Sequence, residues 1–280
     1  MPCIYCGTPW SGSRHRAHIF PVAIFGEHEY LHLEKGEVCA RCNNRTAKLE
    51  SDFKHSLGML QVLHGAVLNR RGEPSRIERP GLVAVKDPAD PWLFLNTSAK
   101  PGRGRDHTIV PPMRFDKEFV VSEPVRTSDG VRLTITQQMP ITKKFRRVLA
   151  KIAFETLAFE RGADLCCQAR FNTLRDFIMK GKGHRAVVMP TKLSAGADGQ
   201  WQLGRGIRIL QLEPPGDLLA LVGVDVPFAV DLSPDGRALG RVFETLPASA
   251  KSGFVLFGLP RQETPVPVLE FPGQEVRKAP

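Results

Sequence analysis

Two short cysteine pairs have the spacing of metal ligands. Cys3 and Cys6 form one Cys-x-x-Cys pair, and Cys39 and Cys42 form the other. Two intervening residues let both sulfurs of a tight turn face one tetrahedral ion, so two such turns supply four thiolate ligands. The pattern predicts a structural zinc site that stabilises a unit with little core of its own. The alternative is four unrelated buried cysteines, and a closed four-cysteine site would leave no coordination position for chemistry.

Two further residues near these pairs are candidates for chemistry. His18 precedes Ile-Phe-Pro, and Asn43 directly follows the second cysteine pair. Imidazole titrates near neutral pH and suits a general base, although a histidine in an apolar segment is also common as a packed strand residue. The amide oxygen of an asparagine suits a hard divalent ion, but an asparagine before a helix is equally typical of an N-cap.

Taken together, the Cys-x-x-Cys, His-Ile-Phe-Pro and Cys-x-x-Cys-Asn strings resemble the HNH endonuclease family. The similarity is to the branch whose ββα-metal fold is stapled by a zinc knuckle, and it covers about residues 3–53. The resemblance implies that His18 is the general base that takes a proton from the attacking water. It also implies that Asn43 binds a catalytic Mg²⁺ or Mn²⁺ ion and that the four cysteines hold zinc.

The sequence departs from the family pattern at two positions. The residue before the base histidine is an acidic metal ligand in the family, and here it is Ala17. The central asparagine of the family has no counterpart in residues 33–38. Candidate substitute ligands are His15, Glu34, Glu37 and Glu50. Two functions follow: a metal-dependent endonuclease that hydrolyses phosphodiester bonds of DNA, or a catalytically degenerate zinc module that binds nucleic acid or protein without cutting.

The charge of the chain is concentrated away from the cysteines. The chain has 280 residues and a formal net charge of +10. Residues 137–185 hold eleven Lys or Arg against four Asp or Glu, whereas residues 1–58 hold seven against six. A block with a net charge of +7 favours a polyanionic partner.

Residues 142–161 are the clearest predicted helix, with Thr142 as its N-cap and Gly162 at its end. On a helical wheel, Lys144, Arg147 and Lys151 form a line opposite the apolar stripe, with few acids on the same face. Such a line can follow a phosphate backbone, and the absence of interleaved aromatic residues favours double-stranded DNA over single strands. The alternative is an ordinary solvated helix face.

The pattern of the whole chain predicts an α+β fold, in which an N-terminal zinc-stapled ββα-metal unit precedes a β-rich domain containing two helices. The expected parts are an HNH-like zinc-knuckle domain, a β-rich segment, a basic helical segment and a β-rich C-terminal part, over residues 1–68, 69–141, 142–185 and 186–280. Helices are also expected over residues 43–68 and 168–180. The tail from Glu263 contains four prolines and is expected to be loosely held.

No apolar run approaches the roughly 18 residues of a membrane span. The N-terminus lacks a basic segment followed by an apolar one, so no signal peptide is predicted. A cytoplasmic protein without a membrane partner is therefore expected, and in that compartment cysteines serve as metal ligands or free thiols more often than as disulfides.

Overall fold

A computed structural model of the chain underlies the description that follows. It describes residues 2–9, 16–21, 32–34, 36–63, 75–79, 82–86, 93–96, 113–116, 119–121, 125–127, 130–138, 141–190, 206–212, 217–223, 226–258 and 268–276. Helices and antiparallel sheets are both present in these residues, so the α+β class is confirmed. No helix in the described part combines the length and the apolar character that a membrane crossing requires.

The described residues form three antiparallel sheets. The first has the order β1-β2-β3 and contains β1 (Ser75–Arg79), β2 (Leu82–Lys86) and β3 (Leu93–Asn96). The second has the order β13-β7-β5-β4, with β6 also paired to β7, and contains β4 (Met113–Asp116), β5 (Phe119–Val121), β6 (Val125–Thr127), β7 (Gly130–Gln138) and β13 (Val268–Val276). The third has the order β12-β8-β11-β10-β9 and contains β8 (Val187–Pro190), β9 (Gly206–Gln211), β10 (Leu218–Gly223), β11 (Pro227–Asp231) and β12 (Phe254–Phe257).

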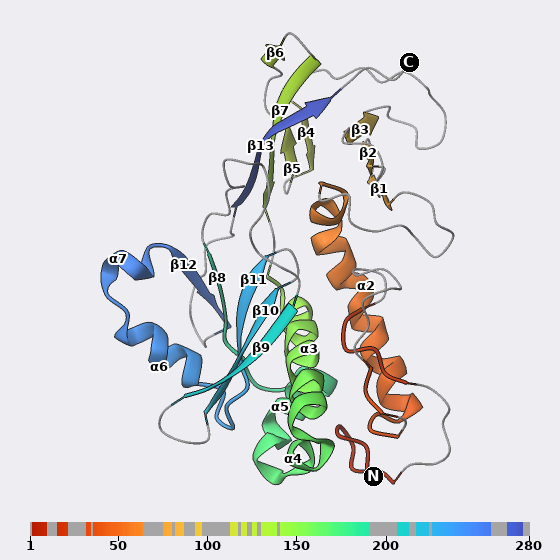
Figure 1. Cartoon of the computed structure of the whole chain (residues 1–280), viewed down its shortest axis with the longest axis vertical. Coiled ribbons are helices and arrows are strands. Elements are labelled where there is room, and N and C mark those ends of the chain that lie inside the picture. Colours follow the sequence, from red (N-terminus) through yellow and green to blue (C-terminus); the bar gives the residue numbers. More distant parts are fainter. Residues whose placement is uncertain are drawn as a thin grey trace.

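The helices gather around the third sheet and beside it (Figure 1). They are α2 (Ala40–Leu63), α3 (Lys143–Arg161), α4 (Ala163–Cys167), α5 (Asn172–Lys180), α6 (Ala238–Thr245) and α7 (Ala248–Lys251). The helix α3 contacts β9, β10 and β11 and also packs against α2, while α6 contacts β10 and β11. The helix α3 therefore lies between the sheet and α2.

The sequence of α3 accounts for its length. The hydroxyl oxygen of Thr142 accepts a hydrogen bond from the Phe145 amide at 3.1 Å and caps the first turn. Gly162 ends the helix with a φ of +92°, which a residue with a side chain rarely adopts. Between these ends, every residue from Val148 to Ala158 is buried. A helix covered on all sides in this way can present few of its side chains to a partner.

One apolar core joins the N-terminal residues to α3, α5 and the third sheet. Ring contacts mark its course: Tyr5 lies 5.7 Å from Phe154, and Phe53 of α2 lies 4.5 Å from Phe145, measured between ring centroids. Phe145 in turn lies 5.5 Å from Phe228 of β11. The cysteine-containing segments are therefore packed against the rest of the molecule and share its core.

Several predicted elements require correction. The helix α2 begins at Ala40 and not at Asn43, and the helix predicted over residues 168–180 is α5, preceded by α4 and a short 3-10 turn. The tail predicted to be loose contains β13, whose residues pair with β7 from Val268↔Gln138 to Val276↔Val131. The prediction rested on the four prolines of the tail, but residues 268–276 pair with β7 across a register shift between Phe271 and Gln274, while residues 263–267 and 277–280 lie outside the described part.

Candidate functional site

The four cysteines of the two pairs converge at one point. The Sγ atoms of Cys3, Cys6, Cys39 and Cys42 all lie within 4.8 Å of one another. Four thiolates around a tetrahedral zinc ion, each about 2.3 Å from it, lie about 3.8 Å apart. The Cys6–Cys39 sulfur separation is 3.7 Å, so the cluster has the dimensions of a metal site. The cysteine prediction is confirmed to this extent: these residues can hold a metal ion.

Local backbone structure builds each half of the cluster. In the first half, the Gly7 amide donates to the Cys3 carbonyl at 2.8 Å and closes a tight turn, and the φ of +69° at Gly7 explains its glycine. In the second half, Cys39 and Cys42 lie at the start of α2, where the first helical turn places residues three apart on one side. The Cys39 amide donates to Cys3 Sγ at 3.3 Å and joins the two halves.

The thiols influence one another strongly. The hydrogen bond from Cys42 lowers the pKa of Cys3 to about 4, whereas the same hydrogen bond raises the pKa of Cys42. Burial raises the pKa of Cys39. The metal ligand is a thiolate and not a thiol. The lowered pKa of Cys3 favours its thiolate form, so this group of thiols is suited to binding a metal cation.

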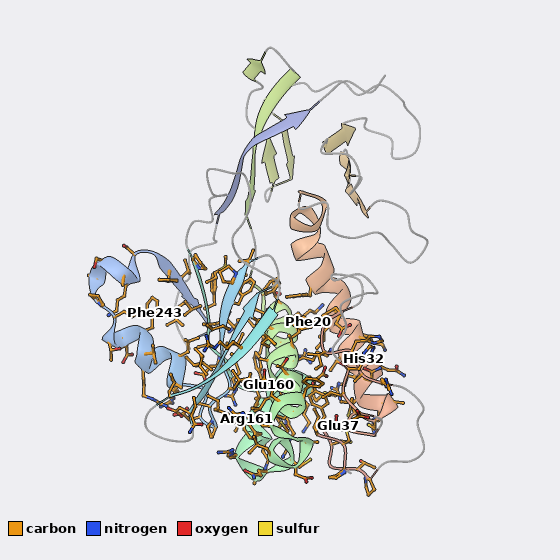
Figure 2. All side chains as sticks on the ribbon, in the orientation of Figure 1. Phe20, His32, Glu37, Glu160, Arg161 and Phe243 are labelled. Carbon is orange, nitrogen blue, oxygen red and sulfur yellow. The ribbon has the colours of Figure 1, made fainter. Side chains whose placement is uncertain are left out.

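His18 lies in a short antiparallel pairing beside α2. It forms a bridge with His32, and the Leu33 amide donates to the Ala17 carbonyl at 3.0 Å. The two imidazole rings are 4.5 Å apart between centroids, and both histidines are half-buried. Figure 2 shows His32 and the neighbouring Phe20 beside α2. His18 therefore faces a second imidazole at a partly open position.

Side chains alternate along the segment that carries His18. Ala17 is 3% exposed and Ile19 is fully buried, and both belong to the apolar core, while His18 between them is half-buried. The position at which the HNH family carries an acid is thus a core position in this chain. The bridge and the following α2 occur in the order of a ββα unit, but residues 22–31 lie outside the described part, so that unit stays a prediction.

Asn43 lies within the first turns of α2 and not at its cap. Its amide donates to the Cys39 carbonyl at 3.0 Å, and its own carbonyl accepts from the Thr46 hydroxyl at 2.9 Å. The N-cap alternative for Asn43 is therefore wrong. Glu50 lies seven residues later, which is two turns along the same face of the helix. Asn43 is half-buried on that face.

The environment of Lys151 differs most from the one predicted from the sequence. Its side chain is 2% exposed, although the helical wheel placed it on a solvent-facing line. The ammonium lies 2.9 Å from Glu155 Oε2 and 3.0 Å from Glu50 Oε1, and it donates to the main-chain oxygens of His18 at 2.5 Å and Ile19 at 3.1 Å. The prediction of an exposed Lys151 is wrong because α2 and the N-terminal segment cover that side of α3.

The other two members of the predicted cationic line differ from each other. The Arg147 guanidinium donates to the carbonyl of Ile178 at 2.9 and 2.7 Å and to that of Met179 at 3.0 Å, so it binds the last turn of α5. Burial lowers the pKa of Arg147, and the charge of Arg45 adds to this effect. Lys144 alone of the three is exposed. No continuous line for a phosphate backbone forms from Lys144, Arg147 and Lys151.

A different cationic surface lies on α2. Arg41, Arg45 and Lys48 are exposed and occupy one face of the helix, at spacings of four and three residues. We call these three residues the α2 basic surface. The surface lies near α3, because α2 packs against α3, and the charge of Arg45 acts on Arg147 of that helix. The charge count of residues 1–58 is nearly neutral and did not indicate the α2 basic surface. Two of the acids in that count do not offset its charge at the surface, because Glu37 is buried and Glu50 pairs with Lys151.

A buried polar network connects the cysteine cluster to His18. The Tyr5 hydroxyl donates to Glu155 Oε1 at 2.8 Å, and Glu155 pairs through its other oxygen with Lys151. Burial raises the pKa of Glu155 to about 7, although Lys151 and Tyr5 oppose this shift. Burial and the neighbouring Glu155 raise the pKa of Tyr5 well above its ordinary value. With Glu50, which also pairs with Lys151, four side chains from the N-terminal segment, α2 and α3 therefore form one network.

Sequence reasoning missed His32, Tyr5 and Glu155 as members of this site. The spacing of Lys151 and Glu155, four residues apart on one helix, was the available signal for an ion pair. No local pattern connects His32 to His18, because their bridge depends on the path of the intervening chain. His15, the candidate substitute ligand, lies outside the described residues. Cys166, which lies outside the cluster, packs in the core in the way a small apolar residue does.

In comparisons with known proteins, no family model matches the chain, and no curated protein and no solved structure matches it either.

Proposed function

We propose that the chain is an HNH-type endonuclease that hydrolyses phosphodiester bonds of DNA with a divalent metal ion. One observation carries the proposal: Lys151 links the His18 segment to Glu50 on the face of α2 that, about 10 Å away along the helix, carries Asn43. Its ammonium contacts both the His18 carbonyl and Glu50, two turns after Asn43 on the same helix face. The candidate base and the candidate metal ligand therefore approach one region of the molecule.

The proposed roles follow from the chemistry of each residue. His18 is the general base that accepts a proton from the attacking water, and its half-buried position leaves part of it accessible to substrate. His32, 4.5 Å away between ring centroids, limits the orientations of the His18 ring. Asn43 provides an amide oxygen for Mg²⁺ or Mn²⁺, and such an ion, when bound, would polarise the scissile phosphate. The cysteine cluster holds zinc as a structural ion, since four thiolates are the ligand set that zinc prefers.

We place the contacts to the phosphate backbone on the α2 basic surface together with Lys144. Arg41, Arg45 and Lys48 are exposed on the helix that also carries Asn43, and Lys144 is exposed at the start of α3. No ion pair joins the α2 basic surface to any described acid. Cations arranged in this way attract a polyanion and release its counterions on binding. Double-stranded DNA is the proposed partner.

The second candidate is a catalytically degenerate module that binds nucleic acid or protein without cutting. A specific observation favours it: Ala17 is part of the core, so the family's acidic ligand is missing and no acid can replace it at that position without burying a charge. Within the described residues, the four cysteines are the only group of three or more His, Cys, Asp or Glu side chains arranged for a metal.

A plasmid-nicking assay separates the two candidates. Purified wild-type chain is incubated with supercoiled plasmid in Mg²⁺, in Mn²⁺ and with a chelator, beside His18→Ala and the control His184→Ala, whose histidine is exposed in another part of the structure. The endonuclease predicts metal-dependent nicking that His18→Ala abolishes and His184→Ala retains. Nicking that persists in His18→Ala refutes the proposed base. DNA binding without nicking under either metal supports the degenerate module.

A further inference from the structure

The environment of Lys151 differs from that of an ordinary buried ion pair. Its ammonium has two carboxylate neighbours, Glu155 at 2.9 Å and Glu50 at 3.0 Å. It also donates to two successive main-chain oxygens, those of His18 and Ile19, which lie 133 and 132 residues away in the sequence. All the hydrogen-bonding capacity of the group is directed at the segment that carries the candidate base and at the two helices beside it.

Stability alone does not explain a buried lysine at this position. Removing two charges from water is costly, and apolar residues of similar size often stabilise a core equally well. An apolar side chain at position 151 would fill the space, but it would leave the His18 and Ile19 carbonyls without their donor. Only a hydrogen-bond donor at position 151 can fix the positions of the His18 and Ile19 carbonyl oxygens.

The path of the chain explains why these oxygens need a donor from outside. The strand-like pairing holds Ala17, whose carbonyl accepts from the Leu33 amide. At Ile19 and Phe20 the chain bends, so the carbonyls of His18 and Ile19 turn toward one point, and Lys151 Nζ occupies that point. Lys151 therefore provides the hydrogen-bond donor at the point where the strand pairing ends. That point is His18, whose imidazole faces His32.

The network also ties this point to the cysteine cluster. Tyr5, between Cys3 and Cys6, donates to Glu155, and Glu155 holds Lys151. Glu50 connects the same ammonium to α2, the helix that begins directly after Cys39 and carries Cys42 in its first turn. The position of the His18 main chain is thus defined relative to both halves of the cluster.

We propose that Lys151 is a positioning residue: its two hydrogen bonds set the main chain at His18 and thereby the orientation of the His18 imidazole against His32. The catalytic consequence of this role rests on the proposed endonuclease function, but the structural consequence does not. A displaced base accepts a proton less efficiently, while the exposed cations that bind DNA are unaffected.

The decisive measurement is the contact between the two imidazoles in solution. Protein with ¹³C-labelled histidine is observed by NMR, and His18 and His32 are assigned with His18→Gln and His32→Gln. In the wild type we expect a nuclear Overhauser effect between the two rings. The double variant Lys151→Met, Glu155→Gln removes the donor without leaving a buried unpaired charge at position 155, and its glutamine still accepts from Tyr5. The matched control is Lys143→Met, an exposed lysine on the same helix.

The proposal predicts that the double variant keeps one zinc ion per chain and loses the His18–His32 contact, while Lys143→Met keeps both. An unchanged contact in the folded double variant would overturn the proposal. If the double variant fails to retain zinc, Lys151→Arg takes its place, since a guanidinium is larger than an ammonium and cannot occupy this buried position without displacing the two carbonyl oxygens. A shifted His18 resonance in that variant supports the proposal, and an unshifted one refutes it.

Activity gives an independent readout. If the wild type nicks DNA, the double variant should lower kcat by roughly ten- to hundredfold and leave KM for DNA nearly unchanged, as expected of a misplaced catalytic group. A rise in KM with an unchanged kcat would contradict a positioning role. If the wild type does not nick DNA, the endonuclease proposal fails while the NMR comparison still tests Lys151.

Discussion

The hydroxyl of Tyr5 donates a 2.8 Å hydrogen bond to Oε1 of Glu155, 150 residues away, and both side chains are buried. Tyr5 belongs to the turn that presents Cys3 and Cys6, and Glu155 belongs to α3 at the centre of the molecule. This polar contact therefore couples the cysteine cluster to the helix that holds the His18 segment. The N-terminal unit is consequently expected to lose stability when this contact is removed.

Tyr5→Phe tests that coupling. The substitution removes the hydroxyl and leaves Glu155 Oε1 without this donor in a buried position, which typically costs about 1.5–3 kcal/mol for a hydrogen bond to a charged group. The free energy of unfolding is measured by urea titration at constant zinc. As a control, Lys143→Met changes an exposed side chain of α3 and should lie within about 0.5 kcal/mol of the wild type. A Tyr5→Phe chain as stable as that control would show that the contact contributes nothing.

Metal removal should unfold the N-terminal unit. The wild type is expected to bind one zinc ion per chain, and Cys3→Ser or Cys42→Ser should lose it, because three ligands cannot complete the closed tetrahedral site. Cys167→Ser is the matched control, since Cys167 lies outside the cluster, with its Sγ 3.9 Å from the Pro2 carbonyl. Zinc content by metal analysis and thermal unfolding with and without chelator provide the measurement. Equal zinc content in Cys42→Ser and Cys167→Ser would contradict the four-cysteine site.

DNA binding should depend on the α2 basic surface. Replacing Arg41, Arg45 and Lys48 by Gln should weaken binding and reduce the slope of log Kd against log salt by about 2–3, since each phosphate contact contributes about 0.9 to that slope. A charge-matched control replaces three exposed arginines on other elements: Arg161, Arg208 and Arg237. Binding is measured by fluorescence anisotropy with a short duplex. Equal losses in the two triple variants would mean that only net charge matters.

The pKa of Glu155 predicts a pH dependence of stability. Burial raises this pKa from 4.5 to about 7. Between these values the folded chain holds a proton that the unfolded chain has released, so the contribution of this group to stability falls as pH rises toward 7. The loss amounts to at most about 3 kcal/mol, at about 1.4 kcal/mol per pH unit. Glu155→Gln should therefore flatten the decline between about pH 4.5 and 7.

The comparison is made by urea titration of Glu155→Gln and of Glu160→Gln, whose glutamate is exposed on the same helix. Both variants retain the cysteine cluster, so the pH dependence of zinc binding is common to them. Curves that run parallel to the wild type in both variants would show that Glu155 does not titrate differently in the folded and unfolded chains.

The features that depend on nearby residues were predictable from the sequence. The Cys-x-x-Cys spacing defines two turns, and both halves of the cluster form as expected. Thr142 and Gly162 define the ends of α3 because capping involves only neighbouring residues.

The features that depend on distant residues were not predictable. The apolar stripe of α3 indicates one buried face, but it does not show that α2 covers the opposite face and buries Lys151. Glu50 reaches Lys151 only because α2 packs on α3, and His32 reaches His18 only through a pairing of separated segments. In both cases, the tertiary arrangement determines which groups surround a charged or titratable side chain.

Chemical rescue can show whether His18 is the general base of a DNA-cleaving site. The nicking rate of His18→Gly is measured with Mg²⁺ or Mn²⁺ at matched zinc content, with and without added imidazole. We expect a rate about 10²- to 10⁴-fold below that of the wild type, and partial recovery with imidazole that His184→Gly does not show. A His18→Gly chain that nicks DNA at the wild-type rate without imidazole would refute the role of His18.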